Sequence, residues 1–292
     1  MDFQHVDVFA SEAFTGNSLT VFIDDGSLTS GQLLTITQEF RHFESVFLTA
    51  TQTPDHWSAR VFDLFGELNF AGHPVLGAAA ALHARLGGGE VRTWLMDLPA
   101  GTVWVETVSS GAGFRATMDQ GRPEYGPVPG APDIAPVLQG IGLQAADLAA
   151  GLEPAVVSTG LRYLLIPVTA TALGRAAIAV SDFADRLAAV GAQFAYLLDP
   201  DHLEGRHWNN DGRTEDVATG SAAGIVGAYL ARRERVPMNE SFVLHQGRFA
   251  GRPSRLRVTP QGQPGNVTRV LVSGDVILVA QGTLAATPGA GR

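Results

Sequence analysis

The sequence predicts an α/β protein made of two related halves, each with a sheet wrapped around one central apolar helix. The first observation is a repeat, because residues 67–82 and 215–230 align without a gap, 148 positions apart in a chain of 292 residues. The second observation is that the helical part of each copy holds almost only Ala, Gly, Val, Ile and Leu. Such a composition is typical of a helix buried on all sides. Identical residues fall at four aligned pairs, Glu67/Glu215, Gly72/Gly220, Ala80/Ala228 and Leu82/Leu230.

The other elements follow from apolar runs and from turn residues. In the first half, the segment Thr29-Ser-Gly-Gln32 is a capping box that begins a helix extending to about Arg41. Residues 13–18 are predicted as a turn, which makes Asn17 a candidate turn residue. Strands are predicted at residues 3–9, 19–23, 45–49, 60–65, 91–96 and 102–107.

A change of composition marks the second half. Residues 119–136 hold five Pro and three Gly, which predicts a linker between an N-terminal half, 1–118, and a C-terminal half, 137–292. A packing of the last strand against the N-terminal half is also compatible with the sequence. Strands that alternate with helices are also typical of a doubly wound parallel sheet, and the residues alone leave that architecture open. The second half has a predicted helix at 183–190 and strands at 161–168, 194–198, 243–244, 256–258 and 270–279.

Composition excludes several classes of function. There is no Cys, which removes thiolate nucleophiles, disulfides and Cys-ligated metals. All 20 basic residues are Arg, so a Schiff-base lysine and the lysine of a phosphate-binding loop are excluded as well. A net charge of −9 with no basic stripe argues against nucleic acid and against a membrane surface as partners. We expect a cytoplasmic protein, since neither a signal peptide nor an apolar run of membrane-spanning length is visible.

The two helix starts predict anion sites. The first turn of a helix has unpaired N–H groups and the positive end of the helix dipole. Gly72 and Gly220 let a ligand approach the backbone closely, and Pro74 suits the first turn. A substrate carboxylate could therefore bind near Gly72, Gly220 and Ser221. The alternative is that these are two buried helices with ordinary caps, and His73 is then a cap residue.

Glu44 is the first candidate for acid–base chemistry. It lies at a predicted helix-to-strand junction among Phe43, Val46 and Phe47. A poorly solvated carboxylate in such a setting suits proton transfer near neutral pH. A solvated glutamate at the end of a helix is the alternative.

Several segments, in this order, resemble the PhzF-like family of phenazine-biosynthesis isomerases. The two most specific are Phe70-Ala-Gly-His-Pro74 and Glu215-Asp-Val-Ala-Thr-Gly-Ser-Ala222. The others are Gly16-Asn-Ser-Leu19, His42-Phe-Glu-Ser-Val-Phe-Leu48, Gln246-Gly-Arg-Phe-Ala-Gly-Arg-Pro-Ser254 and Val272-Ser-Gly-Asp-Val276. The resemblance therefore covers nearly the whole chain.

The resemblance implies a diaminopimelate-epimerase-like fold, with two pseudo-symmetric halves and the active site in the cleft between them. It implies that Glu44 moves a proton within a small carboxylate, assisted by His73 and Asp216. Substrate binding would fall to Asn17, Gly72, Gly220 and Ser221. Neither a metal nor an organic cofactor is expected, and a homodimer is implied. The family's known substrate is trans-2,3-dihydro-3-hydroxyanthranilate.

Two features separate this chain from its implied relatives. The cysteines of the related epimerases align with Ala71 and Thr219, which excludes racemisation by two thiols. Phe43 stands where the phenazine enzyme has a hydroxyl residue, so the substrate stays open. Two rivals to the isomerase therefore remain. One is an epimerase in which Glu44 and Asp216 act on opposite faces of a carbon, and the other is a small-molecule-binding protein without activity.

Overall fold

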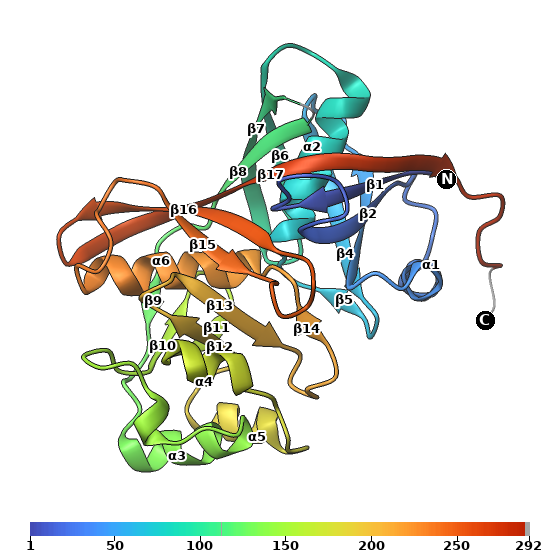
Figure 1. Cartoon of the computed structure of the whole chain (residues 1–292). Helices are drawn as coiled ribbons and strands as arrows, with labels where there is room; N and C mark the ends of the chain where they lie inside the picture. Colours follow the sequence, from blue (N-terminus) through green and yellow to red (C-terminus); the bar gives the residue numbers. More distant parts are fainter. Residues whose placement is uncertain (112, 290–292) are drawn as a thin grey trace. The chain divides into compact units, whose positions relative to one another are not determined.

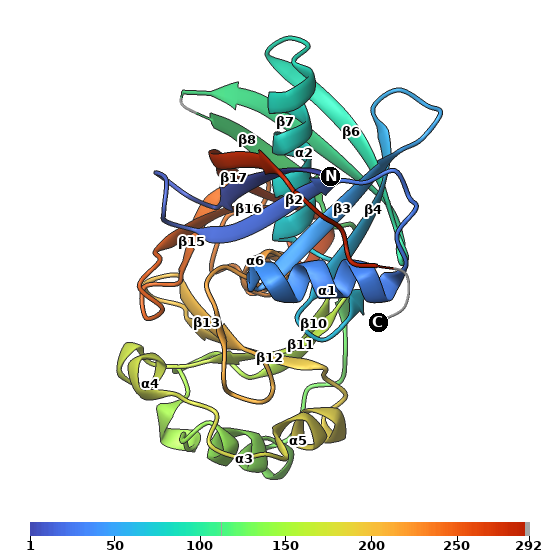
Figure 2. The same cartoon turned by 90° about the vertical axis from the view of Figure 1, so that its right-hand side faces the viewer.

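The structure, a computed structural model, describes residues 1–111 and 113–289. The chain forms two compact units (Figures 1 and 2). Unit 1 comprises residues 1–119 and 273–292, and unit 2 comprises residues 120–272. The long strand β17 (Asn266–Thr283) contributes its first part to unit 2 and its second part to unit 1.

Unit 1 is a ring of paired strands around the helix α2 (His73–Leu86). Its other elements are β1 (Asp2–Val8), β2 (Asn17–Ile23), α1 (Ser30–Phe40), β3 (Glu44–Ala50), β4 (His56–Asp63), β5 (Glu67–Leu68), β6 (Val91–Leu98), β7 (Gly101–Ser110) and β8 (Gly113–Asp119). The ring runs β1–β2–β3–β4–β6–β7–β8–β17 and closes because β17 also pairs with β1. Strands β2 and β3 are parallel, as are β4 and β6.

The helix α2 is enclosed because its surface offers almost nothing polar. Residues 73–83 are all buried, and the helix contacts β1, β2, β3, β6, β7 and β8. Small side chains let the strands approach closely: a Cβ added at Gly77 would lie 2.5 Å from Leu19 and 2.9 Å from Val8. The apolar composition therefore leads to burial on every side, as the sequence predicts. Both views in Figures 1 and 2 show α2 among these strands.

Unit 2 repeats this plan around α6 (Gly220–Arg232), whose residues 220–231 are all buried. Its strands are β9 (Glu124–Tyr125), β10 (Ala155–Ser158), β11 (Arg162–Pro167), β12 (Phe194–Asp199), β13 (Glu204–Trp208), β14 (Glu215–Asp216), β15 (Phe242–Gln246) and β16 (Ser254–Gln263). Strands β11 and β12 are parallel, as are β13 and β15, so the pairing repeats that of unit 1. The ring closes through the segment 120–125, which bonds to Val270 at one end and pairs with β10 at the other.

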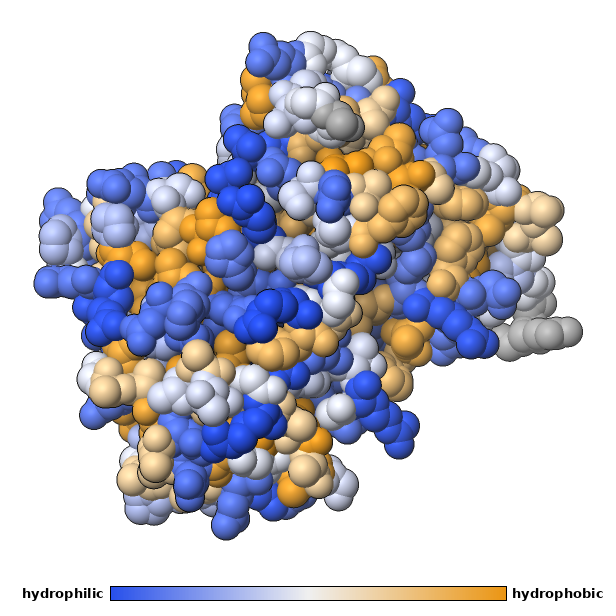
Figure 3. All heavy atoms as spheres, viewed as in Figure 1, coloured by the Kyte–Doolittle hydropathy of each residue, from blue (hydrophilic) through white to orange (hydrophobic). Residues whose placement is uncertain are grey.

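Helices cover the outside of each ring. In unit 1, α1 packs on β3 and β4 over an apolar cluster that includes Leu33, Phe22 and Phe47. In unit 2, a larger cluster joins β11 and β12 to α3 (Ala131–Gly140), α4 (Ala170–Arg175) and α5 (Phe183–Ala189). A short 3-10 helix, η1 (Ala145–Asp147), follows α3. Figure 3 shows hydrophobic and hydrophilic side chains together on the surface of each unit.

Several predictions can be compared with these elements. The capping box is confirmed, because Thr29 accepts a hydrogen bond from the Gln32 N–H and the Gln32 side chain accepts one from the Thr29 N–H. Asn17 is not a turn residue but the first residue of β2, where it is buried. The segment predicted as a linker carries β9 and the start of α3. The helix α3 can begin within this Pro-rich segment because Pro132 lies in its first turn, where the missing N–H costs no hydrogen bond. No described helix is long and apolar enough to cross a membrane.

Candidate functional site

Three of the residues singled out in the sequence meet in unit 1. Asn17 begins β2, Glu44 begins β3, and His73 begins α2. Because β2 and β3 are parallel and Leu19 pairs with Glu44, the starts of both strands lie at one edge of the sheet. Alternation along each strand places Asn17 and Glu44 on the face that carries Leu19 and Val46, which is the face covered by α2.

The His73 ring lies within reach of both partners. Its Nδ1 atom is 3.5 Å from Oε2 of Glu44 and 3.4 Å from Nδ2 of Asn17. The exposed fraction is 4% for the His73 side chain, 13% for the Glu44 side chain and 2% for Asn17. This is a carboxylate and an imidazole in a site that is nearly shut off from water, with Glu44 keeping a small accessible surface.

The position of Nδ1 between an amide and a carboxylate suits two protonation states of the imidazole. When Nδ1 carries no proton, it can accept a hydrogen bond from the Asn17 amide. When Nδ1 carries a proton, it can donate that proton toward Glu44. Nδ1 of His73 therefore has a hydrogen-bonding partner in both states.

Unit 2 holds a second polar cluster, just before α6. The Thr219 hydroxyl donates to Oδ2 of Asp216 at 2.7 Å, and the Ala218 N–H donates to Oδ1 at 3.3 Å. The Gln246 side chain, at the end of β15, contacts both Asp216 and Thr219. Asp216 is only 4% exposed, and its carboxylate accepts these two hydrogen bonds from its own loop.

The first turn of α6 carries the predicted residues Gly220 and Ser221. The Gly220 carbonyl accepts from the Gln120 side chain at 2.8 Å, and the Ser221 hydroxyl lies 2.7 Å from the Tyr163 hydroxyl. The N-cap residue of α2 is Gly72, which has no side chain that could cap the helix. The N-cap residue of α6 is Thr219, whose side chain accepts no hydrogen bond from the first turn. Thr219 is a residue type that often caps helices, but here its Oγ1 atom accepts a hydrogen bond from Gln246 Nε2 at 2.9 Å and none from the first turn of α6.

A match to a known family covers the residues of both clusters. The family model PhzC-PhzF, described as phenazine biosynthesis-like protein, matches residues 6–282. The chain belongs to the PhzC-PhzF family.

Relatives and solved structures agree with this assignment over the full length. A trans-2,3-dihydro-3-hydroxyanthranilate isomerase from Pseudomonas aeruginosa is 31% identical, over 95% of this chain and 96% of that protein. The structure of a protein named as an epimerase, PA4716 from Pseudomonas aeruginosa, is 47% identical, with a TM-score of 0.93 over 98% of this chain and 99% of that one. The curated relatives carry isomerase names, and this chain is an enzyme of that isomerase family.

The fold expected from the sequence is confirmed at longer range. A hydroxyproline epimerase from Agrobacterium vitis superposes with a TM-score of 0.61 at 13% identity, covering 97% of this chain and 91% of that one. At that identity the likeness concerns the fold alone. The two rings around α2 and α6 are the two halves of a diaminopimelate-epimerase-like fold.

In this PhzC-PhzF chain, an arginine–glutamate pair precedes each central helix. Arg60 on β4 bonds both carboxylate oxygens of Glu67 at 2.7 and 2.6 Å. Arg206 on β13 bonds both oxygens of Glu215 at 2.9 and 2.8 Å. Glu67 and Glu215 are aligned in the repeat, and each is bonded by an arginine of its own unit in the same way. This shared ion pair explains why the two aligned residues are identical. Each pair links the short strand before its helix, β5 or β14, to the neighbouring strand, β4 or β13.

Sequence reasoning missed several residues around the second cluster. His207 pairs with Asp216 across β13 and β14, and burial lowers the pKa of His207. Tyr163 bonds Ser221, and Gln246 bonds the Asp216 loop. Gln246 lies in the segment 246–254, which carries part of the family resemblance, and that resemblance could have marked it as a site residue. Tyr163 lies in an apolar run that gave none.

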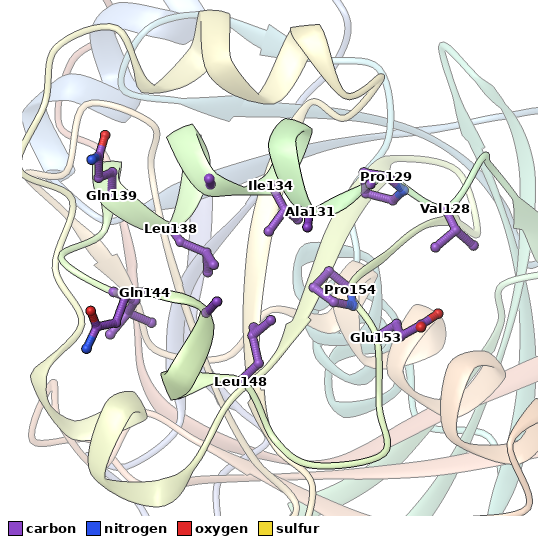
Figure 4. Close-up of a pocket in the computed structure, with 14 residues that line it drawn as sticks. Val128, Pro129, Ala131, Ile134, Leu138, Gln139, Gln144, Leu148, Glu153 and Pro154 are labelled. Atoms are coloured by element: carbon purple, nitrogen blue, oxygen red, sulfur yellow. The ribbon is translucent and has the colours of Figure 1, made fainter.

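One apolar hollow among the described pockets lies elsewhere in unit 2. A cavity of about 500 Å³ is bounded by α3 and by the segment that follows it, and Figure 4 shows its lining. Its walls are mainly aliphatic and proline side chains, with Glu153 as the one carboxylate among them. None of the predicted site residues lines it. Within residues 1–111 and 113–289, no group of three or more His, Asp or Glu is placed to hold a metal ion.

Proposed function

We propose that this chain is an isomerase that moves a proton within a small cyclic or amino carboxylate, and that Glu44 carries the proton. The observation that supports it is the contact of Glu44 with the buried His73 ring at the edge where β2, β3 and α2 all begin. A carboxylate that is 13% exposed can reach a bound molecule while staying largely out of bulk water. Low solvation strengthens its interactions with a substrate proton.

The reaction needs one base that becomes one acid. Glu44 would remove a proton from one carbon of a conjugated system and return it to another carbon of the same system. No atom is gained or lost, and Glu44 ends in the state in which it began. His73 would stabilise the intermediate states, because its Nδ1 has a partner whether or not it is protonated. Asn17 would hold the ring in this orientation.

In unit 2 we propose that the first turn of α6, at Gly220 and Ser221, binds a carboxylate. The support is electrostatic: the helix dipole is positive there, and the cap residue Thr219 accepts no hydrogen bond from the first-turn N–H groups through its side chain. The start of α2 at Gly72 is proposed to bind an anion because the helix dipole is positive there as well and the glycine lets a ligand approach the backbone. Asp216 is proposed as an acceptor for a substrate N–H or O–H group.

The substrate class follows from the relatives and from one difference. Relatives about 30% identical are named for isomerisation of trans-2,3-dihydro-3-hydroxyanthranilate, a cyclic amino carboxylate, and that compound is the first substrate to test. Phe43 precedes Glu44 where the phenazine enzyme has a hydroxyl residue. We therefore propose that the true substrate is a related cyclic or amino carboxylate.

The test combines one substitution with deuterated water. Glu44→Gln keeps the shape of the side chain but cannot accept a proton, so turnover should fall by about 10²–10⁴-fold, the usual contribution of a general acid–base group. Deuterium incorporation into substrate and product should fall with it. The matched control is Glu39→Gln, an exposed glutamate on α1 of the same unit, which should leave turnover unchanged. Near-normal turnover by Glu44→Gln would show that the mechanism is wrong.

The epimerase alternative has one observation in its favour, the epimerase name of the 47% identical structure. An epimerase would place deuterium on the α-carbon with inversion, whereas the isomerase would label a different carbon of the product. A binding protein without activity would exchange no deuterium. The homodimer that the family resemblance implies is also a proposal, and light scattering should give about twice the mass of one chain.

A further inference from the structure

The arginine–glutamate pairs put the strands of the two units in register, and this register gives Glu44 a counterpart in unit 2. The arginine of each pair faces Phe47 of β3 in unit 1 and Leu197 of β12 in unit 2. Three positions before these partners lie Glu44 and Phe194, and each is the first residue of its strand. Both strands have one parallel and one antiparallel neighbour. Phe194 therefore occupies in unit 2 the place that Glu44 occupies in unit 1.

The side chain of Phe194 lies on the face of the sheet that α6 covers. Phe194 pairs with Tyr163 across β11 and β12, and the centroids of the two rings are 5.5 Å apart. The Tyr163 hydroxyl in turn lies 2.7 Å from the hydroxyl of Ser221, in the first turn of α6. Ala195 and Leu197 belong to the cluster under α3, α4 and α5 on the opposite face, as alternation along β12 requires. The Phe194 ring is thus one residue removed from the start of α6.

Two buried rings support Phe194. The centroid of the His207 ring is 5.7 Å from that of Phe194, with planes at 89°, and 5.6 Å from that of Tyr163, with planes at 74°. Tyr163 is 2% exposed and His207 is 5% exposed, whereas Phe194 is partly exposed. Burial lowers the pKa of His207, so this ring is neutral near pH 7. The three side chains form an uncharged aromatic cluster in which Phe194 is the accessible member.

The backbone that carries Phe194 is held from both neighbouring strands. The Gln193 N–H donates to the Arg162 carbonyl at 2.9 Å, and the Arg162 N–H donates to the Gln193 side chain at 3.1 Å. On the other side, the Asn210 side chain donates to the Gln193 carbonyl at 2.9 Å. The start of β12 is therefore a fixed support, and its accessible ring is pre-organised for contact with a ligand.

We propose that Phe194 is a specificity-determining residue that binds the unsaturated ring of a planar cyclic carboxylate. The inference rests on the proposed function in one respect, that the first turn of α6 at Gly220 and Ser221 holds the carboxylate. The contact from Ser221 through Tyr163 to Phe194 then brings an aromatic ring beside that carboxylate. Aromatic rings attract each other beyond the area that they bury, which a saturated ring does not reproduce. Phenylalanine has no proton to exchange, so this place in unit 2 recognises the substrate, whereas the equivalent place in unit 1 is proposed to react with it.

The experiment compares two probes, benzoate and cyclohexanecarboxylate, by titration calorimetry on the full-length protein. Both carry a carboxylate on a six-membered ring, but only benzoate is planar and unsaturated. The parent should bind benzoate more tightly. Phe194→Leu keeps an apolar side chain without the aromatic ring, so the ratio of the two affinities should fall by about 2- to 12-fold, the effect of losing one aromatic pair. Phe194→Tyr keeps the ring and should keep the preference for benzoate.

The matched control is Phe242→Leu. Phe242 is also a partly exposed phenylalanine that begins a strand of unit 2, namely β15. This variant should preserve the affinity ratio of the parent. A ring at position 194 that only fills space would give a different result, because Phe194→Leu would then lower the melting temperature and leave the ratio unchanged. That result overturns the inference, as does a parent that binds both probes equally or binds neither.

A second measurement needs no folded Phe194→Leu. In the parent labelled at phenylalanine, the ring protons of benzoate should show nuclear Overhauser effects to the Phe194 ring, whose signal is assigned by its loss in Phe194→Tyr. Their absence in the saturated complex would contradict the contact.

The outcomes also separate this inference from the proposed function. If Phe194→Leu loses the preference while Glu44→Gln retains turnover, Phe194 binds the ring and the proposed proton carrier is wrong. If Glu44→Gln loses turnover while Phe194→Leu keeps the preference, the proposed function stands and the inference about Phe194 fails.

Discussion

His207 shows how a single buried ring links the stability of unit 2 to pH. Its Nδ1 atom bonds the Ala195 carbonyl at 2.8 Å, which requires the neutral ring to carry its proton there. Burial lowers the pKa of His207 below its usual value of 6.5, and the nearby Asp216 only partly offsets this. The unfolded chain therefore binds a proton near pH 6.5 that the folded protein takes up only at lower pH.

This gives a prediction with a definite sign. The stability that comes from burying the neutral His207 ring is fully present above pH 6.5. It is lost as the pH falls from there toward the lowered pKa of His207 in the folded state. The free energy of unfolding should decrease as the pH falls below 6.5, and His207→Gln should flatten that decrease. Urea denaturation at a series of pH values measures it. His245→Gln, at an exposed position on β15, is the control and should keep the slope of the parent.

At the residue scale, the sequence predicts the parts of the site that are local. His73 stands out because it follows Gly72 at the start of an apolar helix, and Asp216 stands out because it lies four residues before Gly220 at the start of the other. Asn17 and Glu44 reach His73 only through the parallel pairing of β2 with β3, which no local pattern specifies. Gln246 reaches the Asp216 loop across 30 positions of the chain, so its hydrogen bonds could not be read from its neighbours.

At the scale of elements, the two central helices depend on glycines for close packing. Gly77 in α2 faces Leu19, Val8 and Val6, all fully or almost fully buried. The sequence predicts the burial of α2 from its composition, but not which glycine meets a strand. By contrast, the sequence predicts a linker where α3 begins, because two prolines lie in this helix. Pro132 lies in the first turn, where no hydrogen bond is lost, and Pro136 costs the helix one N–H bond.

A pair of Gly→Ala substitutions separates packing from helix propensity. Gly77→Ala should destabilise the protein by about 1–3 kcal/mol, because the added methyl meets side chains that have no space to move into. Gly31→Ala in α1 meets no atom within 4 Å and should stabilise by roughly 0.5–1 kcal/mol. Chemical denaturation compares the two. Equal effects of the same sign would contradict close packing at Gly77.

At the scale of the whole molecule, unit 1 is completed by a distant part of the chain. Residues 276–283 of β17 pair with β1, and β17 also pairs with β8. Deleting residues 273–292 should therefore open the ring of unit 1 and leave both neighbouring strands with unpaired edges. Hydrogen exchange should show lost protection in β1 and β8, with protection kept around α6. Deletion of residues 285–292, which follow β17, should preserve protection in both units.

The division of β17 has a consequence for how the protein is made. Unit 2 is one continuous stretch, whereas unit 1 joins residues 1–119 to the last residues of the chain. During translation, the nascent N-terminal segment emerges first but cannot close its ring until the whole of unit 2 has been synthesised. Until then β1 and β8 present open edges of the kind that invite aggregation and chaperone binding. The half of the protein that carries Glu44 and His73 is thus the first to leave the ribosome and the last to be completed.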